Sequence, residues 1–294
     1  MSKNKAFFLD TNILVKWVYR KILNENPAIE GFINSLSKGQ CVVLPLNLSE
    51  FETIINDAYN MASHVIYEKI ILSKPNWNKL DIEEKSRIID DIRKDFDQLY
   101  EQIRKSKYNG QILPAGIRQM LAKAFFINLE DKLINSDLEA LTNHIALTRK
   151  TEDLTAYIAS VESTIREKCT IFNDIKILVN IDIIKEIQLI YESINKYISK
   201  LKFQKYKKTP SRNDQIIFQY LFLSLRGGLY DEVVFVTDDS DFQRMYDTVL
   251  EHLNDIIIGS ADPRGNFKAH AEEAYEILKN KLEIKGINEL IAKH

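Results

Sequence analysis

Residues 233 to 242 read Val-Val-Phe-Val-Thr-Asp-Asp-Ser-Asp-Phe. The first four are apolar and mostly β-branched, which predicts a strand buried on both faces, as in a parallel sheet. Three carboxylates follow at once: Asp238, Asp239 and Asp241. In an open α/β sheet, ligands bind beyond the carboxyl ends of the strands. We therefore expect this acidic run to lie where such a fold places its chemistry.

A purely structural role is the alternative for the acidic run. Asp and Ser are favoured at helix N-caps, and acids in a first turn interact favourably with the helix dipole. The run by itself does not separate a cap from a site, so support must come from elsewhere in the chain.

That support lies near the N-terminus. Residues Ala6 to Leu9 form another short apolar run, and Asp10-Thr11-Asn12 follow directly, before a helical pattern. Two such strands lying side by side in a parallel sheet would bring Asp10 and Asp239 or Asp241 to the same edge.

Composition narrows the class of protein. The chain has 294 residues, 45% of them hydrophobic, which allows one large domain or two ordinary ones with a substantial core. The net charge of −2 means that any basic surface is local. Cys41 and Cys169 are far apart in sequence, which fits a reducing compartment and gives no zinc site or disulfide framework. With no signal peptide and no long apolar run, we expect a cytoplasmic protein without a membrane span.

A third acidic position, after Asp10 and the run at Asp238 to Asp241, follows another predicted strand. Gln40 to Leu44 has strand character and is ended by Pro45. A new helix then opens, in which Ser49 and Glu52 are spaced as a capping box. This leaves Glu50 in the first turn without a structural role, and makes it a candidate carboxylate beside Asp10. Glu52 is the alternative.

A fourth acid begins a later helix. Asp214 follows Pro210 by four positions and precedes an apolar helical pattern that Gly227-Gly228 ends. It is either a helix cap or a fourth carboxylate of the site. After Phe242 we expect a helix to about Leu253, a final strand at Ile256–Ile258 and a C-terminal helix at 272–282.

The middle of the chain has a different character. From about residue 60 to 205, strand signals disappear and amphipathic helical patterns follow one another, as at 82–104, 117–133, 138–149, 156–167 and 177–201. We expect a discontinuous α/β core, residues 1–60 and 206–294, that carries an all-helical insertion at 61–205.

The insertion ends in the most basic part of the chain. Seven cations lie between residues 196 and 212, interleaved with Tyr197, Phe203 and Tyr206. Cations neutralise phosphates and aromatic rings stack on unpaired bases. The candidate nucleic-acid contacts are Lys202, Lys205, Lys207, Lys208 and Arg212. A solvated helix end is the alternative.

The acids together indicate a metal site. Carboxylates that converge without compensating bases repel one another. A hard divalent cation, Mg²⁺ or Mn²⁺, relieves this repulsion and prefers oxygen ligands. Such an ion activates water and stabilises in-line displacement at phosphorus. With a basic, aromatic segment leading into Asp214, the expected substrate is a polynucleotide.

In these acidic motifs the sequence resembles the PIN-domain nuclease family. The resemblance rests on Phe8-Leu9-Asp10-Thr11-Asn12, Ser49-Glu50, Asn213-Asp214 and Thr237-Asp238-Asp239-Ser240-Asp241-Phe242, in that order. It implies a three-layer α/β fold with a central parallel sheet. It also implies Asp10, Glu50, Asp214, Asp239 and Asp241 as catalytic, metal-binding residues, with Asn12 and Thr237 as polar support. Asp238 is the extra acid and is not expected to be a ligand.

The resemblance further implies metal-dependent endonuclease activity on RNA, as in toxins, defence nucleases or RNA processing. An antitoxin, another protein partner or a homo-oligomer would then be possible partners. One rival is a PIN-like scaffold that binds RNA or protein without cutting. A phosphohydrolase of the haloacid-dehalogenase type is disfavoured, because Asn12 stands where that chemistry needs a second acid.

Overall fold

The computed structural model describes residues 4–105, 114–148, 152–172, 181–202, 209–259 and 267–292. The chain divides into two compact units. Unit 1 comprises Met1–Trp17, Pro27–Leu48 and Ile165–His294, and unit 2 comprises Val18–Asn26 and Ser49–Thr164. Each unit is therefore assembled from segments that are not contiguous in sequence.

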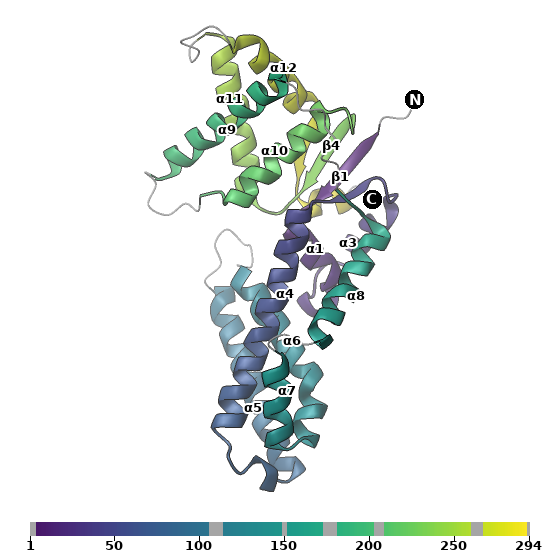
Figure 1. The fold of residues 1–294 in the computed structure, drawn as a ribbon, viewed down its shortest axis with the longest axis vertical. Coiled ribbons are helices and arrows are strands. Elements are labelled where there is room, and N and C mark those ends of the chain that lie inside the picture. Colours follow the sequence, from purple (N-terminus) through teal and green to yellow (C-terminus); the bar gives the residue numbers. More distant parts are fainter. Residues whose placement is uncertain are drawn as a thin grey trace. The chain divides into compact units, whose positions relative to one another are not determined.

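Unit 1 contains the strands and about half of the helices (Figure 1). Its elements are β1 (Lys5–Leu9), α1 (Thr11–Val18), α3 (Ala28–Ser35), β2 (Cys41–Val43), β3 (Thr170–Ile171), α9 (Ile181–Lys202), α10 (Arg212–Arg226), β4 (Glu232–Val236), α11 (Ser240–Ile257), α12 (Lys268–Lys281), β5 (Leu282–Lys285) and α13 (Ile287–Ile291).

A five-stranded sheet forms the centre of unit 1, in the order β3-β2-β1-β4-β5. Every neighbouring pair of strands is parallel. The strands at the centre are almost continuously apolar because helices cover both of their faces. The α/β fold with a central parallel sheet, expected from the sequence, is confirmed.

The two faces of the sheet pack against different helices. Phe8 and Phe235 point into a core shared with apolar residues of α9, α10, α11 and α12. Phe7 points to the opposite face, because side chains alternate along a strand. There its ring packs edge to face on Phe32 of α3, at 5.6 Å between centroids. The sheet thus has helices on both sides.

The last strand is not the one expected. Residues 256–258 were predicted as a strand, but α11 continues to Ile257. Leu253 and Ile256 are buried three positions apart, as on one face of a helix, whereas Ile258 is 68% exposed. The final strand is β5, where the apolar residues Leu282 and Ile284 alternate with charged ones, as is typical of a half-exposed edge strand.

The two cysteines are paired, which corrects the expectation of no disulfide. Cys41 begins β2, and Cys169 directly precedes β3. The register aligns Val42 with Thr170, so the residues before them are neighbours, and Cys41 and Cys169 form a disulfide with their Cα atoms 4.6 Å apart. Their separation of 128 residues concealed the pairing, because only the fold brings the strands together.

The helical insertion differs from its predicted bounds of 61–205. Unit 2 begins at Ser49 and ends at Thr164, apart from its short segment at 18–26. The later residues belong to unit 1, where β3 extends the sheet and α9 contributes Leu189 and Ile194 to the core. A two-residue strand and a buried amphipathic helix carry no sequence signal that separates them from an insertion.

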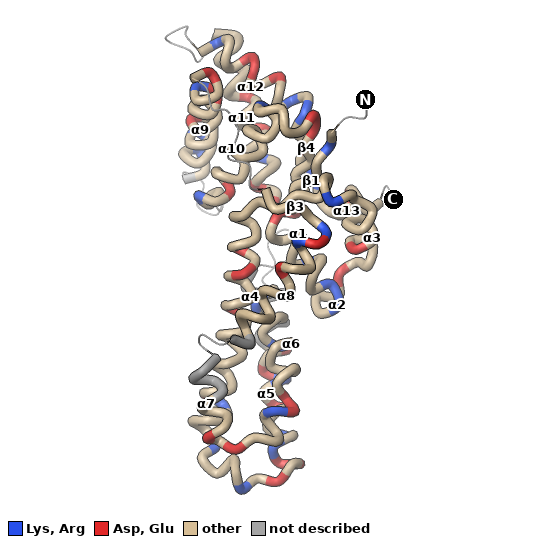
Figure 2. The backbone as a smooth tube through the Cα atoms, turned by 45° about the vertical axis from the view of Figure 1, so that its right-hand side comes forward, with Lys and Arg blue, Asp and Glu red and all other residues tan. Residues whose placement is uncertain are grey.

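Unit 2 is helical in its described part. It contains α2 (Arg20–Leu23), η1 (Tyr67–Leu72, a π-helix), η2 (Trp77–Lys79, a 3₁₀-helix), α5 (Ile82–Lys105), α6 (Pro114–Asn135), α7 (Leu138–Thr148), and most of α4 (Pro45–Ile66) and α8 (Glu152–Lys168). Along α5, both signs of charge are interspersed (Figure 2), and Arg93 pairs with Glu130 of α6. No helix in the described ranges is both long enough and apolar enough to cross a membrane.

Candidate functional site

The ends of β1 and β4 form the centre of the candidate site. The two strands are paired through their whole length, with Leu9 beside Val236. Asp10 continues this pairing, because its backbone N–H donates to the carbonyl of Val236 at 3.0 Å. The strands that follow β1 in sequence, β2 and β3, lie on one side of it, whereas β5, which follows β4, lies on the opposite side of the sheet. The carboxyl ends of β1 and β4 therefore flank the switch point at which open α/β sheets bind ligands.

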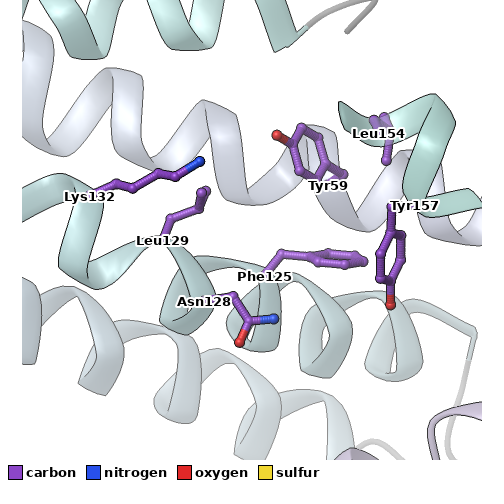
Figure 3. Close-up of a pocket in the computed structure, with 7 residues that line it drawn as sticks. All are labelled: Tyr59, Phe125, Asn128, Leu129, Lys132, Leu154 and Tyr157. Carbon is purple, nitrogen blue, oxygen red and sulfur yellow. The ribbon is translucent and has the colours of Figure 1, made fainter. Parts of the chain in front are cut away.

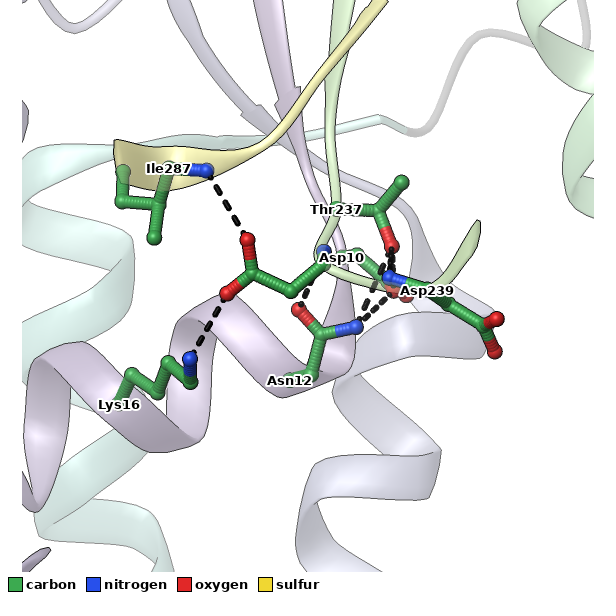
Figure 4. Close-up of polar contacts among 7 residues, drawn as sticks. Asp10, Asn12, Lys16, Thr237, Asp239 and Ile287 are labelled. Carbon is green, nitrogen blue, oxygen red and sulfur yellow. Dashed lines mark hydrogen bonds and ion pairs between the residues drawn. The ribbon is translucent and has the colours of Figure 1, made fainter. Parts of the chain in front are cut away.

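Asp10 is buried, with 7% of its surface exposed, and its carboxylate accepts hydrogen bonds from at least four protein groups. Oδ1 accepts from the backbone N–H of Thr11 at 2.8 Å and from Asn47 Nδ2 at 3.1 Å. Oδ2 accepts from Asn12 Nδ2 at 2.6 Å and Thr237 Oγ1 at 2.6 Å. These donors hold the carboxylate in one orientation at the end of β1 (Figure 4).

The residues expected as polar support, Asn12 and Thr237, both contact Asp10. Asn12 Nδ2 also donates to Thr237 Oγ1 at 3.2 Å, and its Oδ1 accepts from the backbone N–H of Asp238 at 3.4 Å. Asn12 thus links the ends of β1 and β4 as well as orienting the carboxylate.

Asn47 is a contact that sequence reasoning missed. It is fully buried in the first turn of α4, and its Oδ1 has no hydrogen-bond partner. The sequence pattern predicts a helix start near Ser49, but α4 begins at Pro45, a residue favoured in the first helical turn. Ser49 consequently lies inside the helix, and its predicted capping box with Glu52 is wrong. A helix start at Pro45 would have placed Asn47 beside the sheet edge.

Asp238 has a structural role, in agreement with its exclusion from the ligands. Its Oδ2 accepts from Lys16 Nζ at 2.8 Å and its Oδ1 from the backbone N–H of Ile287 at 3.1 Å. This carboxylate thus contacts both Lys16 of α1 and Ile287 of α13. Asp238 therefore joins the end of β4 to α1, near the start of the chain, and to α13, near its end.

Asp239 and Asp241 occupy the start of α11. Asp239 is the N-cap, and its Oδ1 accepts from the backbone N–H of Asp241 at 2.9 Å. Figure 4 shows its carboxylate turned away from Asn12 and Thr237. Asp241 accepts from Arg244 Nη1 at 3.2 Å, and 14% of its side chain is exposed. The cap that the sequence left open as an alternative is present at Asp239.

Tyr197 lies near this end of α11. Its side chain is buried in the core of unit 1, so the stacking role suggested by the basic segment does not fit it. Burial and the negative charge of Asp241 raise the pKa of the Tyr197 hydroxyl, while Arg244 lowers it. Arg244 and Tyr197 are the neighbours of Asp241 that the sequence did not indicate.

Asp214 forms a capping box at the start of α10. Its carboxylate accepts from the backbone N–H of Ser211 at 2.6 Å, and its own N–H donates to Ser211 Oγ at 3.1 Å. Arg212 is exposed at the first position of the same helix. Lys202 ends α9, but its side chain lies outside the described residues, as do Lys205, Lys207 and Lys208.

Glu50 is exposed on α4 and belongs to unit 2. Its assignment to the site of unit 1 stays a prediction. The cluster described in unit 1 consists of Asp10 with its four donors, and of Asp239 and Asp241 after the neighbouring strand.

A divalent cation needs several carboxylate or other oxygen ligands that converge on one point. Within the described ranges, no three or more Asp, Glu, His or Cys side chains come together in a way that could hold a metal ion. Each Asp10 oxygen already accepts two hydrogen bonds, which is the usual capacity of a carboxylate oxygen. In this conformation, the acids do not fit a metal site.

Comparison of the chain with protein-family models, with curated proteins and with solved structures finds no match. The residues at the sheet edge are therefore the basis for inferring function.

Proposed function

We propose that this protein is a nuclease that hydrolyses phosphodiester bonds of RNA and uses Mg²⁺ or Mn²⁺. The observation that carries the proposal is the buried carboxylate of Asp10 at the sheet's switch point, with Asp239 and Asp241 following the adjacent strand. Polynucleotides are polyanions, so an acid-lined edge suits them only with a cation between carboxylate and phosphate.

The ion would supply Lewis acidity and an activated water. Asp10, Asp239 and Asp241 are the residues of unit 1 that would hold it. Asp10 would exchange at least one hydrogen-bond donor for the ion, and Asp239 would turn its carboxylate from its present direction. Roles for Asp214 and Glu50 remain part of the proposal.

A non-catalytic scaffold is the second candidate, and the contacts of Asp10 favour it. A structural role alone is enough to explain a buried carboxylate with these protein donors, because it ties β1, β4 and α4 together. Such a protein would keep the fold and bind RNA or another protein without cutting. Cleavage and binding must therefore be measured separately.

The first test compares wild type with Asp10→Asn on a pool of total RNA, with Mg²⁺, with Mn²⁺ and with EDTA. Asp247→Asn is the matched control, because Asp247 is an exposed acid of α11, outside the cluster. We expect cleavage by wild type and the control that needs metal, and a loss of about 100-fold or more in Asp10→Asn, as for a group that acts in the transition state.

Thermal unfolding of each variant shows whether lost cleavage reflects lost fold. Cleavage that persists in EDTA, or in a folded Asp10→Asn variant, would contradict the proposed site. RNA binding by wild type without metal-dependent cleavage would establish the scaffold instead.

A further inference from the structure

A pocket opens in unit 2, between α4, α6 and α8, and the proposed nuclease site does not include it (Figure 3). Its volume is about 330 Å³, in the lower part of the range of roughly 300 to 1,000 Å³ for small-ligand pockets. Its lining includes Tyr59, Phe125, Asn128, Leu129, Lys132 and Tyr157.

One face of α6 supplies most of the pocket. Phe125, Asn128, Leu129 and Lys132 are three, four and seven positions apart, which places them in a row on the same side of a helix. The row passes from an aromatic ring through an amide and an aliphatic side chain to an ammonium group. Apolar and polar groups are thus ordered along the pocket by the sequence of α6.

The aromatic end of the pocket is held in place before any ligand arrives. Phe125 packs edge to face with Tyr59 of α4 at 5.7 Å and with Tyr157 of α8 at 5.6 Å between centroids. The Tyr157 hydroxyl hydrogen-bonds to that of Tyr19 at 3.2 Å. Rings fixed in this way lose little conformational entropy when a planar ligand packs on them.

The other end of the pocket is cationic. Figure 3 shows Lys132 at the opposite end from Tyr157. Lys132 is exposed and makes no ion pair among the described residues. Asn128, also exposed, offers both a donor and an acceptor, the combination that pairs with the edge of a nucleobase.

We propose that this pocket binds a nucleoside phosphate. The base stacks on the exposed ring of Tyr157, beside Phe125 and Tyr59, Asn128 hydrogen-bonds to the base edge, and Lys132 binds the phosphate. A free mononucleotide and the terminal nucleotide of a single-stranded RNA share this chemistry.

Equilibrium binding to the full chain, with EDTA present to prevent cleavage, tests the proposal. The probes are AMP, GMP, CMP and UMP, the corresponding nucleosides, and a 5′-phosphorylated RNA tetranucleotide. We expect at least one mononucleotide to bind, and more tightly than its nucleoside. In Lys132→Met this preference disappears, whereas Lys79→Met, which removes an exposed lysine elsewhere in unit 2, leaves binding unchanged.

Two variants of Tyr157 separate the ring from its hydroxyl. Tyr157→Phe keeps the ring and is expected to retain binding, whereas Tyr157→Leu is expected to weaken it by about 10-fold or more, because stacking is lost. Should Tyr157→Leu fail to fold, Lys132→Met alone decides. The absence of mononucleotide and tetranucleotide binding in wild type, or binding that Lys132→Met does not change, would overturn the proposal.

The probes also identify the source of the nucleotide. Displacement of the tetranucleotide by the mononucleotide that binds shows that both occupy this pocket. Tighter binding of the tetranucleotide than of that mononucleotide indicates the end of a strand, and binding of mononucleotides alone indicates a free nucleotide. None of these measurements requires cleavage, so a protein without nuclease activity can still have this site.

Discussion

At the scale of single residues, neighbouring acids after β4 have different structural roles. Asp238 is bound to Lys16 and Ile287. Asp239 instead caps α11 with one oxygen, and its carboxylate is turned away from Asn12 and Thr237. The sequence run Asp238-Asp239 alone does not distinguish them. Their contacts do, and they predict opposite consequences of the same substitution.

Asp238→Asn is expected to lower the free energy of unfolding by roughly 1 to 3 kcal/mol, because the charge-assisted bond to Lys16 is lost, and to leave cleavage near wild type. Asp239→Asn is expected to retain stability, since Asn is an equally good N-cap, and to lower cleavage by about 10-fold or more. Urea denaturation and the RNA assay measure the two effects. The reverse pattern would move the chemistry to Asp238.

At the scale of elements, the contact between α9 and α11 contains a pH-sensitive group. His252 Nδ1 lies 2.8 Å from Ser193 Oγ. Burial lowers the pKa of His252 below its ordinary value of 6.5, with Lys196 and Lys200 acting in the same direction and Asp255 and Glu192 against it.

The sign of the effect on stability follows from this pKa. Below pH 6.5 the unfolded chain takes up a proton on His252 more readily than the folded chain. Its contribution to stability is therefore present above that pH and is lost as the pH falls through the folded pKa. Denaturation between about pH 5 and 8 should show a shallower acid decline in His252→Gln. An unchanged slope would mean that His252 does not contribute.

The disulfide links two elements that pair through only two residues each. Reduction of Cys41–Cys169 is expected to lower the free energy of unfolding by about 2 to 4 kcal/mol, because the bond restricts the unfolded chain. Thermal unfolding with and without reductant measures this difference, and Cys169→Ala serves as the control in which reductant has no effect. Wild type that is also insensitive to reductant would show that the thiols are unpaired in solution.

At the scale of the whole molecule, each unit has a core of its own. Phe126 is fully buried in unit 2 and packs on Phe96 at 5.5 Å, while Phe235 is fully buried in unit 1. Units with separate cores are expected to open separately.

Phe126→Ala is expected to destabilise unit 2 by about 3 to 5 kcal/mol, since it leaves a cavity. Hydrogen exchange should then accelerate within residues 49–164 and stay slow in β1 and β4. Equal acceleration in both units would show that the chain unfolds as one cooperative body.

Local sequence patterns determined much of unit 1. Short apolar runs predicted β1 and β4, and the acids behind them predicted that Asp10 and Asp239 follow neighbouring strands. The helices of unit 2 were predicted from their apolar periodicity, as at α5 and α6. Such predictions succeed because strand and helix periods are properties of consecutive residues.

Only the tertiary structure decided the contacts between distant residues. The pairing of Cys41 with Cys169, the inclusion of β3 and α9 in unit 1, and the donation of Asn47 to Asp10 each join segments far apart in the chain. Periodicity shows which face of an element is apolar, but not which element covers it. The orientation of each carboxylate depends on donors supplied by other elements, so the sequence located the acids and the fold determined what each one contacts.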